Sequence, residues 1–234
     1  MKWEFTQAEF MYAWDRLGLD RFPAPLTVRP DVGSQLEWEA LEHQLRQRFP
    51  VLEDPDLLPV LRTAADPDTS FVMVGFRRKP LRAYGGIIAN IGVSVVQRPG
   101  PDPETGGNIV VEVGTPDLVA RVFAAVAGQQ PAGMVGSLVE TWERVQDPGD
   151  VTTLVRDEPS AAHRIRNLLS APRTGHGHIE IRVDRRSTRP FPPRYVSWFD
   201  VEGDGRYTYA RRYGDFVIAP CAELGRTITG LLER

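Results

Sequence analysis

The residues of this sequence best suited to chemistry are a single cysteine, a pair of histidines and a group of carboxylates. Cys221 follows Pro220, where we expect a helix to begin, and the positive end of a helix dipole favours a thiolate. A catalytic cysteine also needs a histidine base within reach, and no histidine lies near Cys221 in the sequence. We therefore expect Cys221 to be a small capping or buried residue rather than a nucleophile.

His176 and His178 lie two residues apart, a spacing that places both rings on the same face of a strand. Such a pair could hold a metal ion, but a zinc site needs three or four protein ligands. Nothing nearby in the sequence completes the set. We therefore expect a polar loop that enters a strand, and no metal.

The carboxylates Asp200, Glu202 and Asp204 cluster where a hairpin turn is expected. They could hold Ca²⁺, but their spacing matches no calcium-binding loop, and turn formation explains them adequately. The sequence also contains no Gly-x-Ser-x-Gly elbow, no phosphate-binding loop and no His-Glu-x-x-His motif.

The sequence therefore predicts no catalytic residue, no metal and no cofactor. By itself, this absence favours a binding protein only slightly over an enzyme. The alternatives are a small-molecule enzyme with Cys221, or His176 and His178, in its site, and a structural or regulatory domain that forms dimers.

The composition is that of a soluble globular protein. The chain has 234 residues, 41% of them hydrophobic and 25% charged, enough for one large domain or two small halves. Its formal net charge of −3 argues against a dedicated nucleic-acid-binding protein. Arginines between Arg185 and Arg194 form a local basic stretch, which we expect to be a solvated hairpin loop.

Cysteine content and hydropathy bear on the cellular compartment. A single cysteine excludes an intramolecular disulfide and fits a reducing compartment. The first residues include Glu4, Glu9 and Asp15 and lack the uninterrupted apolar segment of a signal peptide. No apolar run approaches the roughly 20 residues that span a bilayer. We expect a cytoplasmic protein without membrane insertion.

Residues 177–234 have the pattern of an antiparallel meander closed by a helix. Ile179, Ile181 and Val183 alternate with charged residues, as in a half-buried strand. Further strands are expected at 195–199, 206–210 and 216–218, with turns at 202–205 and 214–215. The helix from Pro220 has an apolar face formed by Leu224, Ile228, Leu231 and Leu232.

Capping patterns place the first helices. Thr6 and Glu9 have the spacing of a capping box, as do Ser34 and Glu37. A third helix is expected from Asp56, as its cap, through Ala65. The side chains expected to face inward are Phe10, Met11, Trp14 and Leu17 in the first helix and Leu36, Leu41 and Leu45 in the second, with Trp38 as a further candidate.

The middle of the chain reads as further strands. One is expected at 70–76, followed by a turn at 77–80 and two strands within 81–97, broken near the glycines at 85, 86 or 92. Residues 100–107 are rich in Pro, Gly and acid, which favours a flexible loop, and 109–113 is again a strand.

Two segments, 111–118 and 217–224, both read as a strand, a cap and a helix, and each follows an antiparallel meander. Thr115 is the expected cap of the first helix, with Pro116 at its first position. We therefore predict an α/β (α+β) fold of two quasi-symmetric halves. Each half is an antiparallel β-meander followed by an α-helix, with additional helices packed around. The halves, roughly 1–128 and 129–234, are expected to form a single domain of residues 1–234.

Residues 129–155 leave two interpretations open. Residues 134–145 form either one helix or a short strand followed by a helix from Glu140. A loop is expected at 147–150 and a helix from Pro159 to Leu169.

Several motifs carry a resemblance to a known family. They are Leu-Leu-Ser-Ala-Pro-Arg-Thr-Gly (168–175), Ser-Trp-Phe-Asp (197–200), Asp-Gly-Arg-Tyr (204–207) and Gly-Asp-Phe-Val (214–217). At the amino terminus they are Phe-x-x-Ala-Glu-Phe-x-x-Ala-Trp-Asp-Arg-Leu-Gly-Leu (5–19) and Pro-x-Pro-Leu (23–26). In order and spacing these motifs resemble EspG, the chaperone family associated with ESX (type VII) secretion in actinobacteria.

The resemblance implies two pseudo-symmetric α/β halves and a cytosolic chaperone that is not an enzyme. Such a protein would bind the apolar helical tip of a secreted PE/PPE-like partner and keep it soluble for export, or form a homodimer in the absence of substrate. The strands between 87 and 96 are apolar at nearly every position, more than a one-sided sheet needs. The candidate partner-binding residues are therefore Ile88, Ile91, Val93 and Val95, framed by the carboxy-terminal helix. Taken singly, each of the four is better explained as a core residue of a strand.

Overall fold

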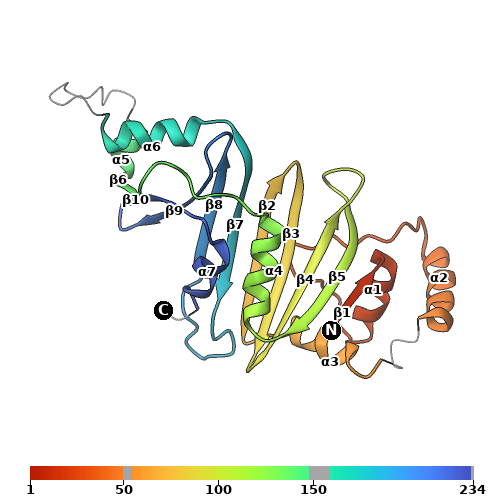
Figure 1. The fold of residues 1–234 in the computed structure, drawn as a ribbon. Coiled ribbons are helices and arrows are strands. Elements are labelled where there is room, and N and C mark those ends of the chain that lie inside the picture. Colours follow the sequence, from red (N-terminus) through yellow and green to blue (C-terminus); the bar gives the residue numbers. More distant parts are fainter. Residues whose placement is uncertain (50–53, 148–158, 233–234) are drawn as a thin grey trace.

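The computed structural model describes residues 1–49, 54–147 and 159–232, which form a mixed α/β fold around one antiparallel sheet (Figure 1). The ten strands of these residues lie in the order β1-β5-β4-β3-β2-β7-β8-β9-β10-β6. Their bounds are β1 Lys2–Phe5, β2 Thr69–Arg77, β3 Lys79–Ile88, β4 Ile91–Pro99, β5 Gly106–Gly114, β6 Leu138–Thr141, β7 Arg173–Arg182, β8 Arg194–Val201, β9 Arg206–Arg212 and β10 Asp215–Pro220.

Helices pack on both faces of this sheet. In the described parts of the chain they are α1 Gln7–Asp15, α2 Gln35–Arg48, α3 Leu57–Ala65, α4 Asp117–Ala127, α5 Trp142–Gln146, α6 Ala161–Ser170 and α7 Leu224–Thr229. None of these helices has both the length and the apolarity needed to cross a bilayer.

The centre of the sheet is the pairing of β2 with β7, which joins the strands of residues 1–128 to those of residues 129–234. From the centre to the edge, the strands of the first part lie in the order β2-β3-β4-β5-β1 and those of the second part in the order β7-β8-β9-β10-β6. Counted along the chain, both orders are second, third, fourth, fifth and first. A helix follows the fifth strand in both parts, α4 after β5 and α7 after β10. This order agrees with two related halves, whose quasi-symmetry stays a prediction.

The two faces of the sheet carry different helices. On one face, the side chains of Phe71 and Met73 in β2, and of Ile179 and Ile181 in β7, are fully buried against α4 and α7. On the other face, α1 and α3 cover β3, β4 and β5, with α2 packed on α1, and α5 and α6 cover the strands at the opposite edge. Figure 1 shows this arrangement, with α4 and α7 over the central strands and the remaining helices toward the two ends.

A buried ion pair fastens the segment that links the two parts of the chain. Asp200 is 1% exposed and Arg206 is 3% exposed. The Arg206 Nε and Nη2 atoms donate to the Asp200 carboxylate at 2.7 and 2.9 Å, and Nη2 also donates to the Ala127 carbonyl at 2.9 Å. The main chain of Arg206 donates to the Pro131 carbonyl and accepts from the Gly133 N–H. Arg206 therefore binds both the end of α4 and the linker that follows it.

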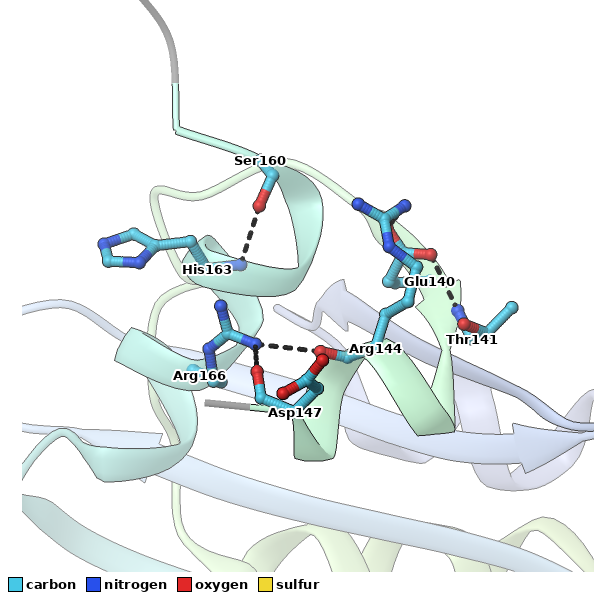
Figure 2. A network of polar contacts seen from close by, with 7 residues as sticks. All are labelled: Glu140, Thr141, Arg144, Asp147, Ser160, His163 and Arg166. Atoms are coloured by element: carbon cyan, nitrogen blue, oxygen red, sulfur yellow. Dashed lines mark hydrogen bonds and ion pairs between the residues drawn. The ribbon is translucent and has the colours of Figure 1, made fainter. Parts of the chain in front are cut away.

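A second polar network joins α5 to α6 (Figure 2). The Arg166 Nη1 atom of α6 donates to the carbonyl oxygens of Arg144 and Asp147, each at 2.8 Å. Carbonyls at the end of a helix have no partner within it and carry the negative end of its dipole, so a cation is favourable there. Ser160 caps α6 by accepting the His163 N–H at 3.2 Å. The network fixes α6 against the end of α5.

The capping patterns are confirmed fully at α1 and only in part elsewhere. At α2 the Ser34 hydroxyl accepts the Glu37 N–H, but the Glu37 carboxylate binds the N–H of Gly33 instead of that of Ser34. Leu36 on this helix is exposed, so its predicted inward position is wrong. The cap of α4 is Pro116, one residue later than expected.

The sequence pattern does not predict β1 and leaves β6 as one of two alternatives. Both are four-residue edge strands, too short to show a clear alternation. For residues 134–145 the structure has the second alternative, the strand β6 followed by α5.

The glycines at 85, 86 and 92 do not break strands, contrary to expectation; they lie inside β3 and β4, and the turn falls at residues 89–90. A Cβ atom at Gly85 would collide with Val119 of α4. Glycine therefore serves close helix–sheet packing here, a role that the sequence pattern does not distinguish from a turn.

Two loops expected to be flexible or solvated make specific contacts. In the loop expected at 100–107, Asp102 accepts the Thr105 N–H at 2.8 Å, and β5 already begins at Gly106. In the basic stretch, Arg186 forms an ion pair with Asp66 at 2.9 Å.

Replacing Asp200 by alanine should destabilise the fold by about 3–5 kcal/mol, because Arg206 would stay buried without its counter-charge. Chemical denaturation of the purified protein measures this free energy. The matched control is Glu202→Ala on the exposed turn beside it, which should change stability by less than about 0.5 kcal/mol. A loss below about 1 kcal/mol for Asp200→Ala would contradict the role given to the ion pair.

Residues 1–128 and 129–234 should not fold separately. Separation would expose the paired edges of β2 and β7 and the apolar face that α4 and α7 cover together. Each fragment, produced alone, is expected to aggregate or to lack fixed tertiary structure by near-ultraviolet circular dichroism. Cooperative unfolding of either fragment would show two domains rather than one.

Candidate partner-binding surface

One area of the sheet lies between the two groups of helices on the same face. The helices α1 and α3 pack on β1 and β3–β5, and α5 and α6 pack on β6 and β10. Between them β2, β7 and β8 present side chains to solvent, of which Val74 is 43% exposed, Phe76 41% and Tyr195 50%. Strand register places these three on one face with His176 and His178. We call these five residues the central window.

The strand β2 is apolar on both of its faces. Phe71 and Met73 point toward α4, whereas Val72, Val74 and Phe76 point to the opposite face. An antiparallel strand with one solvated face normally alternates apolar and polar residues. Contiguous apolar side chains that stay exposed mark interaction surfaces. The composition of β2 therefore makes the central window a candidate surface for a partner.

The rings of the central window are stacked in pairs across strands. The ring centroids of Phe76 and His176 lie 6.4 Å apart with an interplanar angle of 26°, and those of His178 and Tyr195 lie 5.1 Å apart at 26°. A shallow hollow of about 320 Å³ lies beside them and is also lined by Trp198. Stacked rings are held in place before binding, so this surface can take an apolar side chain at low entropic cost.

A second hollow of about 690 Å³ extends the window toward α5. Tyr195, Tyr209 and Trp142 line it, and the Arg211 guanidinium lies 5.0 Å from the centroid of the Trp142 ring. Leu231, two residues after the end of α7, lines it as well. The surface available to a partner is therefore broader than the window itself.

His178 and Ser197 have the geometry closest to that of a catalytic pair. The His178 Nδ1 atom lies 2.8 Å from the Ser197 Oγ atom. Within the described ranges, however, no carboxylate hydrogen bonds to the His178 ring. The flanking backbone belongs to strands paired on both sides, so the ladder uses the N–H groups that an oxyanion hole would need. The arrangement is that of a cross-strand contact.

Cys221 lies on the opposite face of the sheet from the window histidines. The N-cap of α7 is Glu223, so Cys221 precedes the helix and does not cap it, contrary to one of the roles expected for it. Its side chain is buried among residues that pack with α4 and α7, and its Sγ atom lies 3.7 Å from the Thr227 hydroxyl. The sheet thus separates Cys221 from His176 and His178, and the three do not form one site.

The carboxylates expected at 200–204 are divided between separate structural roles. Asp200 forms the buried ion pair with Arg206, and Asp204 accepts the Tyr207 hydroxyl at 2.5 Å. Burial, together with the Asp204 carboxylate, raises the pKa of Tyr207 to about 12. Over the residues that the structure describes, no three His, Cys, Asp or Glu side chains are grouped to hold a metal ion.

The chain is similar to known proteins in both sequence and fold. The family model named EspG family matches residues 6–222 of the chain. The chain belongs to the EspG family. No sequence among the curated proteins matches it. A solved structure, that of the Mycobacterium tuberculosis type VII secretion system chaperone EspG5 in complex with the PE25–PPE41 dimer, has a similar fold. The TM-score is 0.68 at 16% sequence identity, over 100% of this chain and 96% of that chain.

The four residues expected to bind a partner lie at two depths in this EspG-family fold. Val93 and Val95 are fully buried, in the core that α1 and α3 form with β4, so they are not part of a surface. Ile88 and Ile91 flank the turn between β3 and β4 and are only partly covered. Their contact with a partner stays a prediction.

His176 and His178 were candidates in the sequence because of their spacing, but only as possible metal ligands. Val74, Phe76 and Tyr195 were not among the candidates. A signal was present in β2, whose apolar residues occupy both faces of the strand, but it does not say which face an EspG-family fold leaves uncovered.

Burial lowers the pKa of His178 below its usual value of 6.5, and the nearby Glu180 carboxylate opposes this shift. A lowered pKa means that protonation favours the unfolded chain. The contribution of His178 to stability is therefore complete above about pH 6.5 and decreases as the pH falls toward the pKa of the folded state.

The unfolding free energy of the wild type should therefore fall more steeply from pH 7.5 to pH 5 than that of His178→Gln, which cannot be protonated. Denaturant titrations at several pH values measure both. Parallel curves for the two proteins would contradict a lowered pKa at His178.

Proposed function

We propose that this protein is a cytosolic chaperone that binds the apolar helical tip of a secreted PE/PPE-like protein and keeps it soluble for type VII (ESX) secretion. The observation that carries the proposal is the central window, an apolar and aromatic surface left uncovered in the fold of a chaperone family. Support comes from EspG5, a structurally similar protein that was solved in complex with the PE25–PPE41 dimer.

The chemistry of the window fits this task. A helical protein with an exposed apolar tip aggregates unless the tip is covered, and the window offers Val74, Phe76 and Tyr195 for that purpose. The helices on either side leave a bounded area, so a narrow tip suits it better than a flat surface. Neither Cys221 nor the window histidines occupy an arrangement that supports catalysis, which favours binding over enzymatic turnover.

The window would also be open to a second copy of the chain. We propose that free protein forms a homodimer through this surface and that the substrate displaces the second copy. Ile88 and Ile91, at the β3–β4 turn, are retained as candidate contacts outside the window.

Replacing Val74 by aspartate should abolish partner binding while leaving the fold intact. Val74 is exposed in the free protein, but a partner on the window would bury the new carboxylate without a counter-charge. We expect the affinity to fall at least about 100-fold. Co-expression with a PE/PPE-like protein, followed by titration calorimetry, measures this.

The matched control is Val139→Asp, a valine 56% exposed in β6 whose side chain points to the other face of the sheet. It should bind the partner like the wild type. If both variants bind equally well, the partner binds elsewhere on the protein. If no such partner depends on the wild-type protein for its solubility, the chaperone function itself is contradicted.

A further inference from the structure

A hollow of about 460 Å³ lies beside the central window, between the strands β2 and β3 and the segment that follows α1. Strand register places three of its lining residues, Ser70, Val72 and Tyr84, on the same face of the sheet as the window. Trp14 and Phe22 form the side toward α1. We call this site the tyrosine hollow.

Two hydroxyl groups of the tyrosine hollow have no partner in the fold. Ser70 is 5% exposed and Tyr84 is 6% exposed, yet neither hydroxyl hydrogen bonds to a protein group in the described residues. Tyr207, which is also buried, uses its hydroxyl to bind the Asp204 carboxylate at 2.5 Å. Buried polar groups in native proteins are nearly always hydrogen-bonded, so each exception calls for an explanation. Both hydroxyls are available to a ligand that enters the hollow.

Arg185 is held at the same hollow by contacts to the main chain. Its N–H donates to the Asp68 carbonyl at 2.9 Å, and its Nη1 atom donates to the Pro67 carbonyl at 3.0 Å. Among the residues that the structure describes, no carboxylate pairs with this guanidinium. Arg185 therefore brings a positive charge and unused donors to the hollow.

The other charges that line the tyrosine hollow balance one another. Arg182 forms an ion pair with Glu180. Arg21 and Asp20 are adjacent, exposed and of opposite charge. The charge of Arg185 is the one left over, which favours an anionic ligand.

The Tyr84 hydroxyl is a proton donor at neutral pH. Burial raises the pKa of Tyr84 to about 12, and the Arg185 guanidinium opposes this shift while the Asp66 carboxylate adds to it. Asp66 is itself engaged in an ion pair with Arg186 at 2.9 Å. The hydroxyl thus lies within reach of the Arg185 charge, and both groups can donate to the same anion.

We propose that the tyrosine hollow binds an acidic side chain of the partner whose apolar tip lies on the central window. The carboxylate of that side chain accepts from the Ser70 and Tyr84 hydroxyls and from the Arg185 guanidinium. This inference rests on the proposed function and adds a polar contact to it. The site would select partners that carry Asp or Glu close to the apolar tip.

The tyrosine hollow and the central window are continuous along β2. Val72 lines the hollow, and Val74 of the window is the next residue of β2 on the same face. Ser70 lies about 13 Å along the strand from Val74, close to the diameter of one helix with its side chains. A helical tip on the window therefore brings neighbouring side chains to the hollow.

A carboxylate matches the donors better than a neutral group does. It accepts several hydrogen bonds at once, and those made to an ionised acceptor are the strongest. An amide in the same place would bring donors of its own and would leave the charge of Arg185 uncompensated.

The first test removes each hydroxyl alone and titrates the variants with the PE/PPE-like partner. Tyr84→Phe and Ser70→Ala should each bind about 10-fold more weakly, the usual loss for one hydrogen bond to a charged group. Their unfolding temperatures should equal or exceed that of the wild type, because neither hydroxyl has a partner in the fold. The matched controls are Tyr12→Phe, a tyrosine 5% exposed in α1 and outside the hollow, and Ser94→Ala, a serine 1% exposed on the other face of the sheet. Both should bind like the wild type.

The second test concerns the charge. Arg185→Gln should bind about 10-fold more weakly at low salt, and its affinity should depend less on salt than that of the wild type. Arg164→Gln, on the exposed side of α6 at the opposite edge of the sheet, should leave both unchanged. Thermal unfolding checks that each variant is folded.

Substitution of each acidic residue near the partner's tip by its amide identifies the bound side chain. In a double-mutant cycle with Tyr84→Phe, the correct acid gives a loss that is smaller than the sum of the single losses. If the wild type binds the partner but the hydroxyl and arginine variants bind equally well, or if no acid of the partner couples to Tyr84, the role of the hollow is wrong and the chaperone function stands. If the wild type binds no such partner, both proposals fall.

Discussion

The pairing of β2 with β7 is the interaction on which the rest of this structure depends. It joins five strands from each part of the chain into one sheet and brings Phe71 and Met73 beside Ile179 and Ile181. The helices that cover these residues come from both parts, since α4 follows β5 and α7 follows β10, and they pack on each other. Neither part therefore completes the central core without the other.

The same pairing explains why a surface is left open. On one face, α4 and α7 occupy the space over β2 and β7. On the other face, the remaining helices lie toward the two ends of the sheet. The opposite side of the central pair then has no helix of its own in the described residues. An apolar strand in that position exposes every second side chain, which is how Val74 and Phe76 come to the surface.

Strong local patterns could be read from the sequence, whereas contacts between distant segments could not. The alternation around Ile179 and the capping box of α1 predict their elements correctly because the signal lies within a few residues. Gly85 was misjudged because its reason is Val119 of a helix further along the chain. Val93 and Val95 were expected on a surface because an apolar strand does not reveal which of its faces a helix will cover. The family could be recognised from ordered motifs even though each is weak alone.

The core and the central window both draw on neighbouring residues of one strand. Met73 is buried against α4, whereas Val74 and Phe76 belong to the window. The period of two along a strand assigns these roles, and a slip of one residue against β7 would exchange the buried set for the exposed one. Gly75 helps to exclude such a slip, since a Cβ atom there would lie 2.6 Å from the His176 carbonyl oxygen. The register that stabilises the core is thus also what determines which side chains a partner meets.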